Sequence, residues 1–261
     1  MRIQSTWWRA VVTILAFCQM AAYSQPQSKT SLSSSARDLP DLKGEYITGT
    51  GFYGTQLQLL PNHAFTFQSG SDIAHAPNPH NKGSYHVQNG SLFLMPQLPV
   101  TSTEEWNRLP LHLLPVLWGK RTYLLSTEHK SLLAFCNAVN TGNEPRHQIN
   151  GRFYLKSGDE NKGISGLPPL PSEWHAYLLT APIQATLVSV LNSKRGVINA
   201  GRSQGIQAGM LVWSQKTGRH GYSYVVMEVQ STTATVINVQ GDPFGPKFVG
   251  QKVSTFDPQH R

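Results

Sequence analysis

Cys136 is the first residue to weigh as a catalytic group, because a thiol beside an imidazole can be activated to attack a substrate. The nearest histidines on either side of it in the sequence are His129 and His147. Cys136 also lies on the apolar stripe of a predicted helix, and a buried free cysteine packs as a small hydrophobe. We therefore interpret Cys136 as a structural thiol. The alternative is a thiol-dependent hydrolase with His129 or His147 as its base.

His75 and His80 lie in the densest histidine region and are the candidates for binding a metal ion. Imidazole nitrogens are common zinc ligands. Their spacing matches no common ligand motif, and the prolines between them indicate a loop. The favoured interpretation is a pair of solvated loop histidines, and a metal-dependent hydrolase is the alternative.

Two short polar segments are candidates for ligand binding. Arg121 and Tyr123 alternate along a predicted strand and therefore share one face, where an arginine can stack on an aromatic ligand. Glu144 and Arg146 follow a predicted helix in a polar loop, and loops on rigid scaffolds often carry binding residues. The favoured interpretations are core packing of Trp118 and Tyr123, and a helix stop followed by an internal ion pair of Glu144 and Arg146; ligand binding at these residues is the alternative.

Motifs of the common enzyme classes are missing from the sequence. It has no phosphate-binding loop, nucleophile elbow or zinc-protease motif. Its paired carboxylates are sequence neighbours in a predicted helix start and a turn, where charge is solvated. We therefore predict no cofactor and favour a non-enzymatic protein.

The first residues predict export. Arg2 and Arg9 supply a positive start, and small residues follow the apolar run from Ala10 to Ala22, so we expect residues 1–24 to be a cleavable signal peptide. The apolar run is shorter than the roughly 20 residues that cross a bilayer. An uncleaved signal is the alternative, and it is the only route by which we expect membrane association. Residues 25–41, rich in Ser and Gln, are predicted to be a disordered tether.

The charge of the chain is moderately basic. Its formal net charge is +8, and Arg2 and Arg9 leave with the predicted signal peptide. The remaining Lys and Arg residues are scattered rather than clustered, so we predict no nucleic-acid partner. An envelope protein or a cell-wall component fits a basic exported chain better.

Residues 44–98 alternate short apolar segments with turn residues. Gln56 to Leu60 and Ala64 to Phe67 show the period of two that marks a half-buried strand. Pro61 to His63 and Gln88 to Gly90 supply hairpin turns. Consecutive hairpins build a meander, and closing the meander removes its exposed edges.

The motifs of this region also resemble a known architecture. They run in the order Gly-x-Tyr, Leu-x-Leu, Asn-His-x-Phe-x-Phe, Lys-Gly-x-Tyr and Asn-Gly-x-Leu-x-Leu. This order resembles lipocalin-like small barrels. The resemblance implies an N-terminal barrel that can hold a small ligand.

The middle of the chain predicts helices. Leu132, Cys136 and Val139 recur at helical spacing and Gly142 follows as a C-terminal cap, which predicts an amphipathic helix over residues 128–140. A capping-box spacing predicts a short helix from Ser102 to Leu109. Residues 163–181 are predicted to be a Gly/Pro linker with one more short helix, capped by Ser172.

Residues 185–256 return to a β pattern. Gly201, Gly205 and Gly209 recur every four residues between the predicted strands Val197 to Asn199 and Met210 to Ser214. This stretch is similar to the core of small envelope β-barrels found in the rod-shape protein MreC and in the C-terminal domain of flagellar assembly protein T. The resemblance implies an interaction module without catalytic residues. The region before it lacks the coiled-coil heptads of MreC, so the resemblance implies a fold and a mode of use.

The sequence as a whole predicts a mainly β (α+β) protein. We expect an N-terminal barrel or meander over residues 42–162, the linker over 163–181, and a small C-terminal barrel over 182–257. The predicted function is an exported, non-enzymatic binding or scaffold protein of a bacterial-type cell envelope, periplasmic or secreted. It would contact another envelope component and hold a small ligand.

Overall fold

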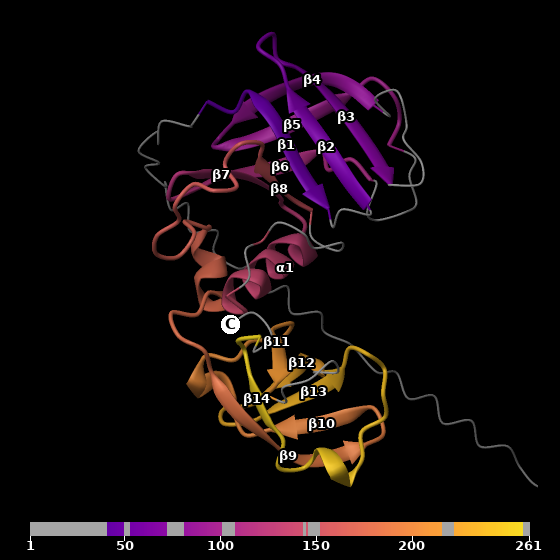
Figure 1. Cartoon of the computed structure of the whole chain (residues 1–261), viewed down its shortest axis with the longest axis vertical. Helices are drawn as coiled ribbons and strands as arrows, with labels where there is room; N and C mark the ends of the chain where they lie inside the picture. The colour runs from indigo at the N-terminus through magenta and orange to yellow at the C-terminus, as the bar shows by residue number, and fades with distance from the viewer. Residues whose placement is uncertain are drawn as a thin grey trace, which may run out of the picture. The chain divides into compact units, whose positions relative to one another are not determined.

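Two closed β-barrels and one α-helix make up the part of the chain that the computed structural model describes (Figure 1). The first barrel has eight strands and the second has six. The predicted mainly β fold is thereby confirmed. The predicted signal peptide, nearly all of the tether and most of the predicted helix 102–109 lie outside the described residues. The described residues are 41–49, 53–71, 81–100, 108–142, 145, 152–215 and 222–257.

The first barrel is an antiparallel meander in which each strand pairs with the next and β8 pairs with β1. Its predicted hairpins are confirmed. Its strands are β1 (Gly44–Gly49), β2 (Tyr53–Leu59), β3 (Ala64–Ser71), β4 (Asn81–Gln88), β5 (Ser91–Pro96), β6 (His112–Trp118), β7 (Arg121–Ser126) and β8 (Phe153–Lys156).

The two ends of the first barrel differ in their connections. At one end, tight turns join β2 to β3, β4 to β5 and β6 to β7, and we call this the turn end. His63, Asn89 and Gly119 adopt positive φ values of 58°, 51° and 61° there, which hairpin turns require. Because neighbouring strands run in opposite directions, longer segments join β3 to β4, β5 to β6 and β7 to β8 at the other end. We call it the connection end.

The interior of the first barrel is filled by large apolar side chains. The register pairs Tyr46 with Leu57 and Leu57 with Phe67, so the three share the inner face. Strands β7 and β8 are buried on both faces, because Leu124 and Tyr154 point inward while Leu125 and Phe153 pack outside the barrel. The inner cluster comprises Leu42, Tyr46, Leu57, Leu59, Phe65, Phe67, Tyr85, Leu92, Leu94, Leu109, Leu113, Leu124 and Tyr154.

Helix α1 (His129–Asn140) covers the outer face of β7 and β8. Phe135 is fully buried, with its ring centroid 5.6 Å from those of both Tyr123 and Phe153. Gly142 follows the helix with a φ of 78°, the left-handed conformation that ends many helices. The predicted helix is confirmed to within one residue.

The second barrel has a different strand order, β10-β13-β12-β11-β14-β9. Gly205 and Gly209 take φ values of 92° and 85° in the connection that leads into β11, which agrees with the predicted turning segment. Its strands are β9 (Gln184–Asn192), β10 (Arg195–Ile198), β11 (Leu211–Ser214), β12 (Ser223–Val229), β13 (Ala234–Asn238) and β14 (Lys252–Ser254).

Three short 3₁₀ helices complete the described elements: η2 (Ser172–Tyr177), η3 (Arg202–Gln204) and η4 (Pro246–Phe248). The predicted capping role of Ser172 is wrong. Pro171 takes the N-cap position of η2, and no side chain caps it.

Helix α1 also bonds to the second half of the chain through two asparagines, and both barrels belong to one compact unit. The Asn137 side chain donates to the Gly209 carbonyl and accepts from the Leu211 N–H, both at 3.0 Å. Asn140 donates to the Tyr177 carbonyl at 2.8 Å and accepts from the Leu179 N–H at 2.9 Å. Each amide therefore pairs with an extended backbone much as a neighbouring strand would.

Candidate ligand-binding site

A row of hydroxyl groups lines the interior of the first barrel towards its connection end. Thr48 pairs with Thr55, and Thr55 pairs with Ser69, so the three side chains lie side by side across β1, β2 and β3. Thr55 and Ser69 are each 5% exposed. The buried Oγ1 atom of Thr48 has no hydrogen-bond partner among the described residues. Such a group costs free energy unless something binds it.

Tyr154 extends this row on β8. Ile47 pairs with Leu155, which places Thr48 opposite Tyr154 when the ladder is continued by one residue. Burial raises the pKa of the Tyr154 hydroxyl to about 12, while its interactions with Thr55 and with the charge of Arg152 act in the opposite direction. Tyr154 is therefore a neutral hydroxyl at physiological pH, close to both groups.

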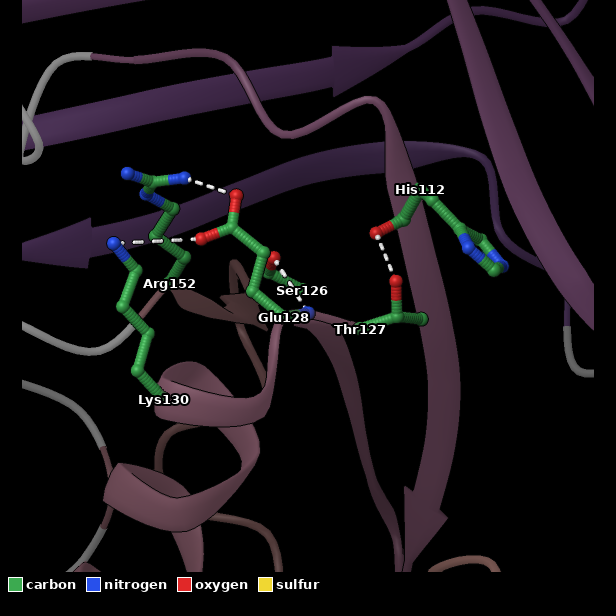
Figure 2. A network of polar contacts seen from close by, with 6 residues as sticks. All are labelled: His112, Ser126, Thr127, Glu128, Lys130 and Arg152. Atoms are coloured by element: carbon green, nitrogen blue, oxygen red, sulfur yellow. Dashed lines mark hydrogen bonds and ion pairs between the residues drawn. The ribbon is translucent and has the colours of Figure 1, made fainter. Parts of the chain in front are cut away.

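Arg152 comes two residues before Tyr154. Because alternate residues of a strand share a face, Arg152 also faces the interior of the barrel. Its backbone carbonyl accepts a hydrogen bond from the Ser126 N–H at 2.8 Å, which continues the β7–β8 ladder. The residue is 5% exposed. Its Nη1 atom lies 2.7 Å from Oε1 of Glu128 in a charge-assisted hydrogen bond (Figure 2). The barrel thus carries a buried guanidinium at its connection end.

Glu128 pairs with two cations. Its second carboxylate oxygen lies 3.6 Å from Nζ of Lys130, which approaches the carboxylate from the same side as the Arg152 guanidinium (Figure 2). Glu128 occupies the N-cap position of α1, but its side chain makes no capping hydrogen bond. Its backbone N–H donates to the Ser126 hydroxyl at 3.4 Å. The first turn of α1 and the end of β7 therefore position the carboxylate.

Thr127 anchors the same segment to β6. Its hydroxyl donates to the His112 carbonyl at 3.4 Å, and its N–H donates to the same oxygen at 3.2 Å. Thr127 thereby anchors the segment that carries Glu128 and Lys130 into α1. Guanidinium, ammonium and hydroxyl groups bind and orient anions, which makes the cluster of Glu128, Lys130 and Arg152 suited to recognition.

The structure separates Arg121 and Tyr123 from this cluster. Tyr123 is fully buried, with its ring centroid 6.3 Å from Trp118 and 5.6 Å from Phe135, which agrees with the favoured interpretation of core packing. Arg121 begins β7 at the turn end, where its Nε donates to the Lys162 carbonyl. Glu144 and Arg146 lie outside the described residues.

Cys136 and His129 do not form a nucleophile–base pair in this structure. Seven residues of α-helix separate them by about 10 Å along the axis, and the His129 ring lies against Trp174 at 5.1 Å. Cys136 is fully buried, and burial raises the pKa of its thiol to about 12. The thiol therefore stays protonated near neutral pH. His147 lies outside the described residues.

The predicted metal candidates His75 and His80 also fall outside the part of the chain that the structure describes. Within that part, no group of three or more His, Cys, Asp or Glu residues could hold a metal ion. None of its helices has the length and apolar character needed to span a bilayer.

Sequence reasoning missed the residues that form this cluster. Arg152 precedes the apolar run Phe153 to Leu155, and its parity with Tyr154 was a readable signal that it faces inward. Glu128 and Lys130 gave no such signal. Their role depends on how α1 begins relative to β8.

Comparison with known proteins finds no match to this chain among protein-family models, curated proteins or solved structures. The resemblances of residues 44–98 and 185–256 to other barrels therefore stay predictions.

Proposed function

We propose that this chain is an exported, non-enzymatic binding protein of a bacterial-type cell envelope. Its first barrel binds a small ligand at the connection end, and its second barrel contacts another envelope component. The observation that carries the proposal is the buried guanidinium of Arg152 beside a row of interior hydroxyls. The turn end of the same barrel is closed by apolar side chains such as Leu59 and Phe65.

A stabilising role alone is a poor explanation for a charge at this position. Removing an ion from water costs several kcal/mol, and exchanging a buried ion pair for apolar residues is often neutral or stabilising. An apolar residue at position 152 would continue the inner cluster without that cost. A ligand that uses the guanidinium supplies a reason for the charge.

The second barrel supports a contact role through its exterior. Its buried cluster consists of apolar residues and Tyr224, and the polar residues buried on its described strands, Ser214, Ser223, Asn238 and Ser254, are uncharged. Large apolar side chains are exposed on its outside, where a partner can cover them. They are Val188, Leu191, Met227, Val239 and Val249.

Purification of the full chain from its own envelope tests the ligand. Native mass spectrometry of the purified protein is expected to show a bound small molecule, which is lost in Arg152→Gln. The matched control is Arg195→Gln, which removes an exposed arginine of the second barrel that pairs with Glu228 at 3.2 Å. Retention of the molecule by Arg152→Gln in a folded protein would place the ligand elsewhere.

Export and partner binding need separate measurements. N-terminal sequencing of the secreted or periplasmic protein is expected to begin near residue 25. Cross-linking in intact cells is expected to join the second barrel to an envelope protein or to cell wall. An unprocessed, cytosolic chain without cross-links contradicts the proposal.

A further inference from the structure

We infer that the ligand of this site carries a carboxylate, which binds Arg152 in place of the carboxylate of Glu128. This inference rests on the proposed function and specifies the chemical class of the ligand. The Nη1–Oε1 distance of 2.7 Å shows that the guanidinium already accommodates a carboxylate. A planar guanidinium fork matches a carboxylate in two parallel hydrogen bonds. The incoming group needs only the volume that the Glu128 carboxylate vacates.

Unequal burial makes Glu128 the partner that leaves. The Arg152 side chain is 7% exposed, whereas the Glu128 side chain is 35% exposed and that of Lys130 is 52% exposed. An arginine cannot shed its charge in a protein, so the guanidinium needs an anion. Glu128 makes no capping hydrogen bond that its departure would break. Water can therefore solvate the displaced carboxylate at low cost.

Interior hydroxyls supply further contacts on the inner side of the guanidinium. Thr48 lies opposite Tyr154 and is therefore the diagonal neighbour of Arg152 across the two strands. Diagonal neighbours in a sheet are about 7–8 Å apart. The Thr48 hydroxyl is buried and has no partner within the described ranges. It can donate a hydrogen bond to the second carboxylate oxygen or to a substituent beside it.

Glu128→Gln in the full mature chain tests the displacement. The amide keeps the size of the side chain and removes the competing charge. NMR titration at constant ionic strength measures the dissociation constant of acetate, and we expect it to be at least tenfold lower in Glu128→Gln than in wild type. Acetamide, which has the same shape without the charge, is expected to show no such gain. Glu173→Gln, an exposed change in η2, is the matched control and should leave acetate binding unchanged.

Arg152 variants complete the test. Arg152→Gln is expected to abolish the acetate response. If this variant does not fold, Arg152→Lys, which keeps the charge but lacks the planar guanidinium, takes its place in the titration. If Glu128→Gln is unstable alone, acetate but not acetamide should raise its Tm. Equal acetate affinity in wild type and Glu128→Gln overturns the inference. If a neutral molecule nevertheless co-purifies with the wild-type chain, the proposed binding function survives and only the ligand class is wrong.

Discussion

The two barrels of this protein close in different ways and carry different interiors. In the first barrel every strand pairs with its sequence neighbours, and its interior holds a buried arginine and a row of hydroxyls beside an apolar cluster. In the second barrel the strand order is β10-β13-β12-β11-β14-β9, and the apolar cluster is joined by polar but uncharged groups, namely Ser214, Asn238 and the Tyr224 hydroxyl. That hydroxyl donates to Gln251 at 2.6 Å.

The difference is in line with the proposed division of labour. Polar groups inside a barrel reduce stability unless they are satisfied, so under the proposed function the first barrel exchanges some stability for ligand binding at its connection end. The second barrel, which buries no charged residue on its described strands, would use its outer surface for contacts with a partner. Helix α1 connects the two because it packs on β7 and β8 and hydrogen-bonds β11.

Truncating a core leucine in each barrel gives the largest expected effect and tests whether the barrels are separate units. Leu57 and Leu187 are both fully buried, one in each barrel. Leu57→Ala and Leu187→Ala should each lower the free energy of unfolding by about 3 kcal/mol. Hydrogen exchange should show the loss mainly in the barrel that carries the change. Equal loss of protection in both barrels would mean that they unfold as one unit.

Asn137→Ala removes two of the hydrogen bonds that link α1 to the second barrel. It leaves the Gly209 carbonyl and the Leu211 N–H without their side-chain partner, and an unsatisfied buried group costs about 1–3 kcal/mol. We expect a loss of about 2 kcal/mol in chemical denaturation. Asn192→Ala is the control, because Asn192 accepts its hydrogen bond from Lys194 in an exposed turn. A similar loss in both variants would argue against a specific role for Asn137.

Alkaline pH is expected to weaken the helix between the barrels through Cys136. Its pKa rises from 9.0 in the unfolded reference to about 12 in the fold, so the native state keeps a proton that the unfolded state loses. The stabilisation is complete below pH 9 and falls as the pH rises towards 12. Wild type should lose about 1 kcal/mol more than Cys136→Ala between pH 9 and pH 10.

The same burial predicts slow chemistry at Cys136. A thiol reagent should react slowly with the native protein and quickly after unfolding. Rapid reaction of the native thiol at neutral pH would revive a thiol-dependent activity in the first half of the chain.

Gly90→Ala gives the smallest expected effect and probes the turn chemistry of the first barrel. Gly90 has a φ of 78°, and an added Cβ would meet no atom within 4 Å. The left-handed conformation costs an alanine about 1–2 kcal/mol, partly offset by the lower entropy of its unfolded chain. We expect a net loss below about 1 kcal/mol, measured as a shift in the denaturation midpoint.

Gly209→Ala sharpens the contrast with the second barrel. At Gly209 the added Cβ would lie 2.5 Å from the Leu133 side chain on α1, so this change should cost more than Gly90→Ala. Equal losses would show that the contact with α1 is easily relaxed.

The strands and the main helix could be predicted because local patterns specify them. The alternation of polar and apolar residues from Gln56 to Leu59 indicates a strand with one solvent-exposed and one buried face. Asn89-Gly90 favours positive φ and therefore a hairpin turn. The strand and the turn both follow from residue chemistry alone. Strand ends were less predictable. Ladder pairing extends β3 to Ser71 beyond the predicted Phe67, because a partner strand stabilises residues whose own propensity is weak.

The candidate site could be predicted only in part. The position of Arg152 next to an inward-facing tyrosine is a local property of strand alternation. Its partner Glu128 comes from the start of a helix, and the Thr48–Thr55–Ser69 row requires the register of three strands. Register depends on which strands meet and on the length of each connection, which no single segment specifies.

The sequence by itself determined the β-rich composition of the fold, the positions of its turns and the helix that ends before Gly142. These follow from short-range sterics and from hydrophobic spacing along a few residues. Only the tertiary structure decided that the first sheet closes through the pairing of β8 with β1, and that Glu128 meets Arg152. Those outcomes depend on packing between segments far apart in the chain, where burial and charge pairing act together.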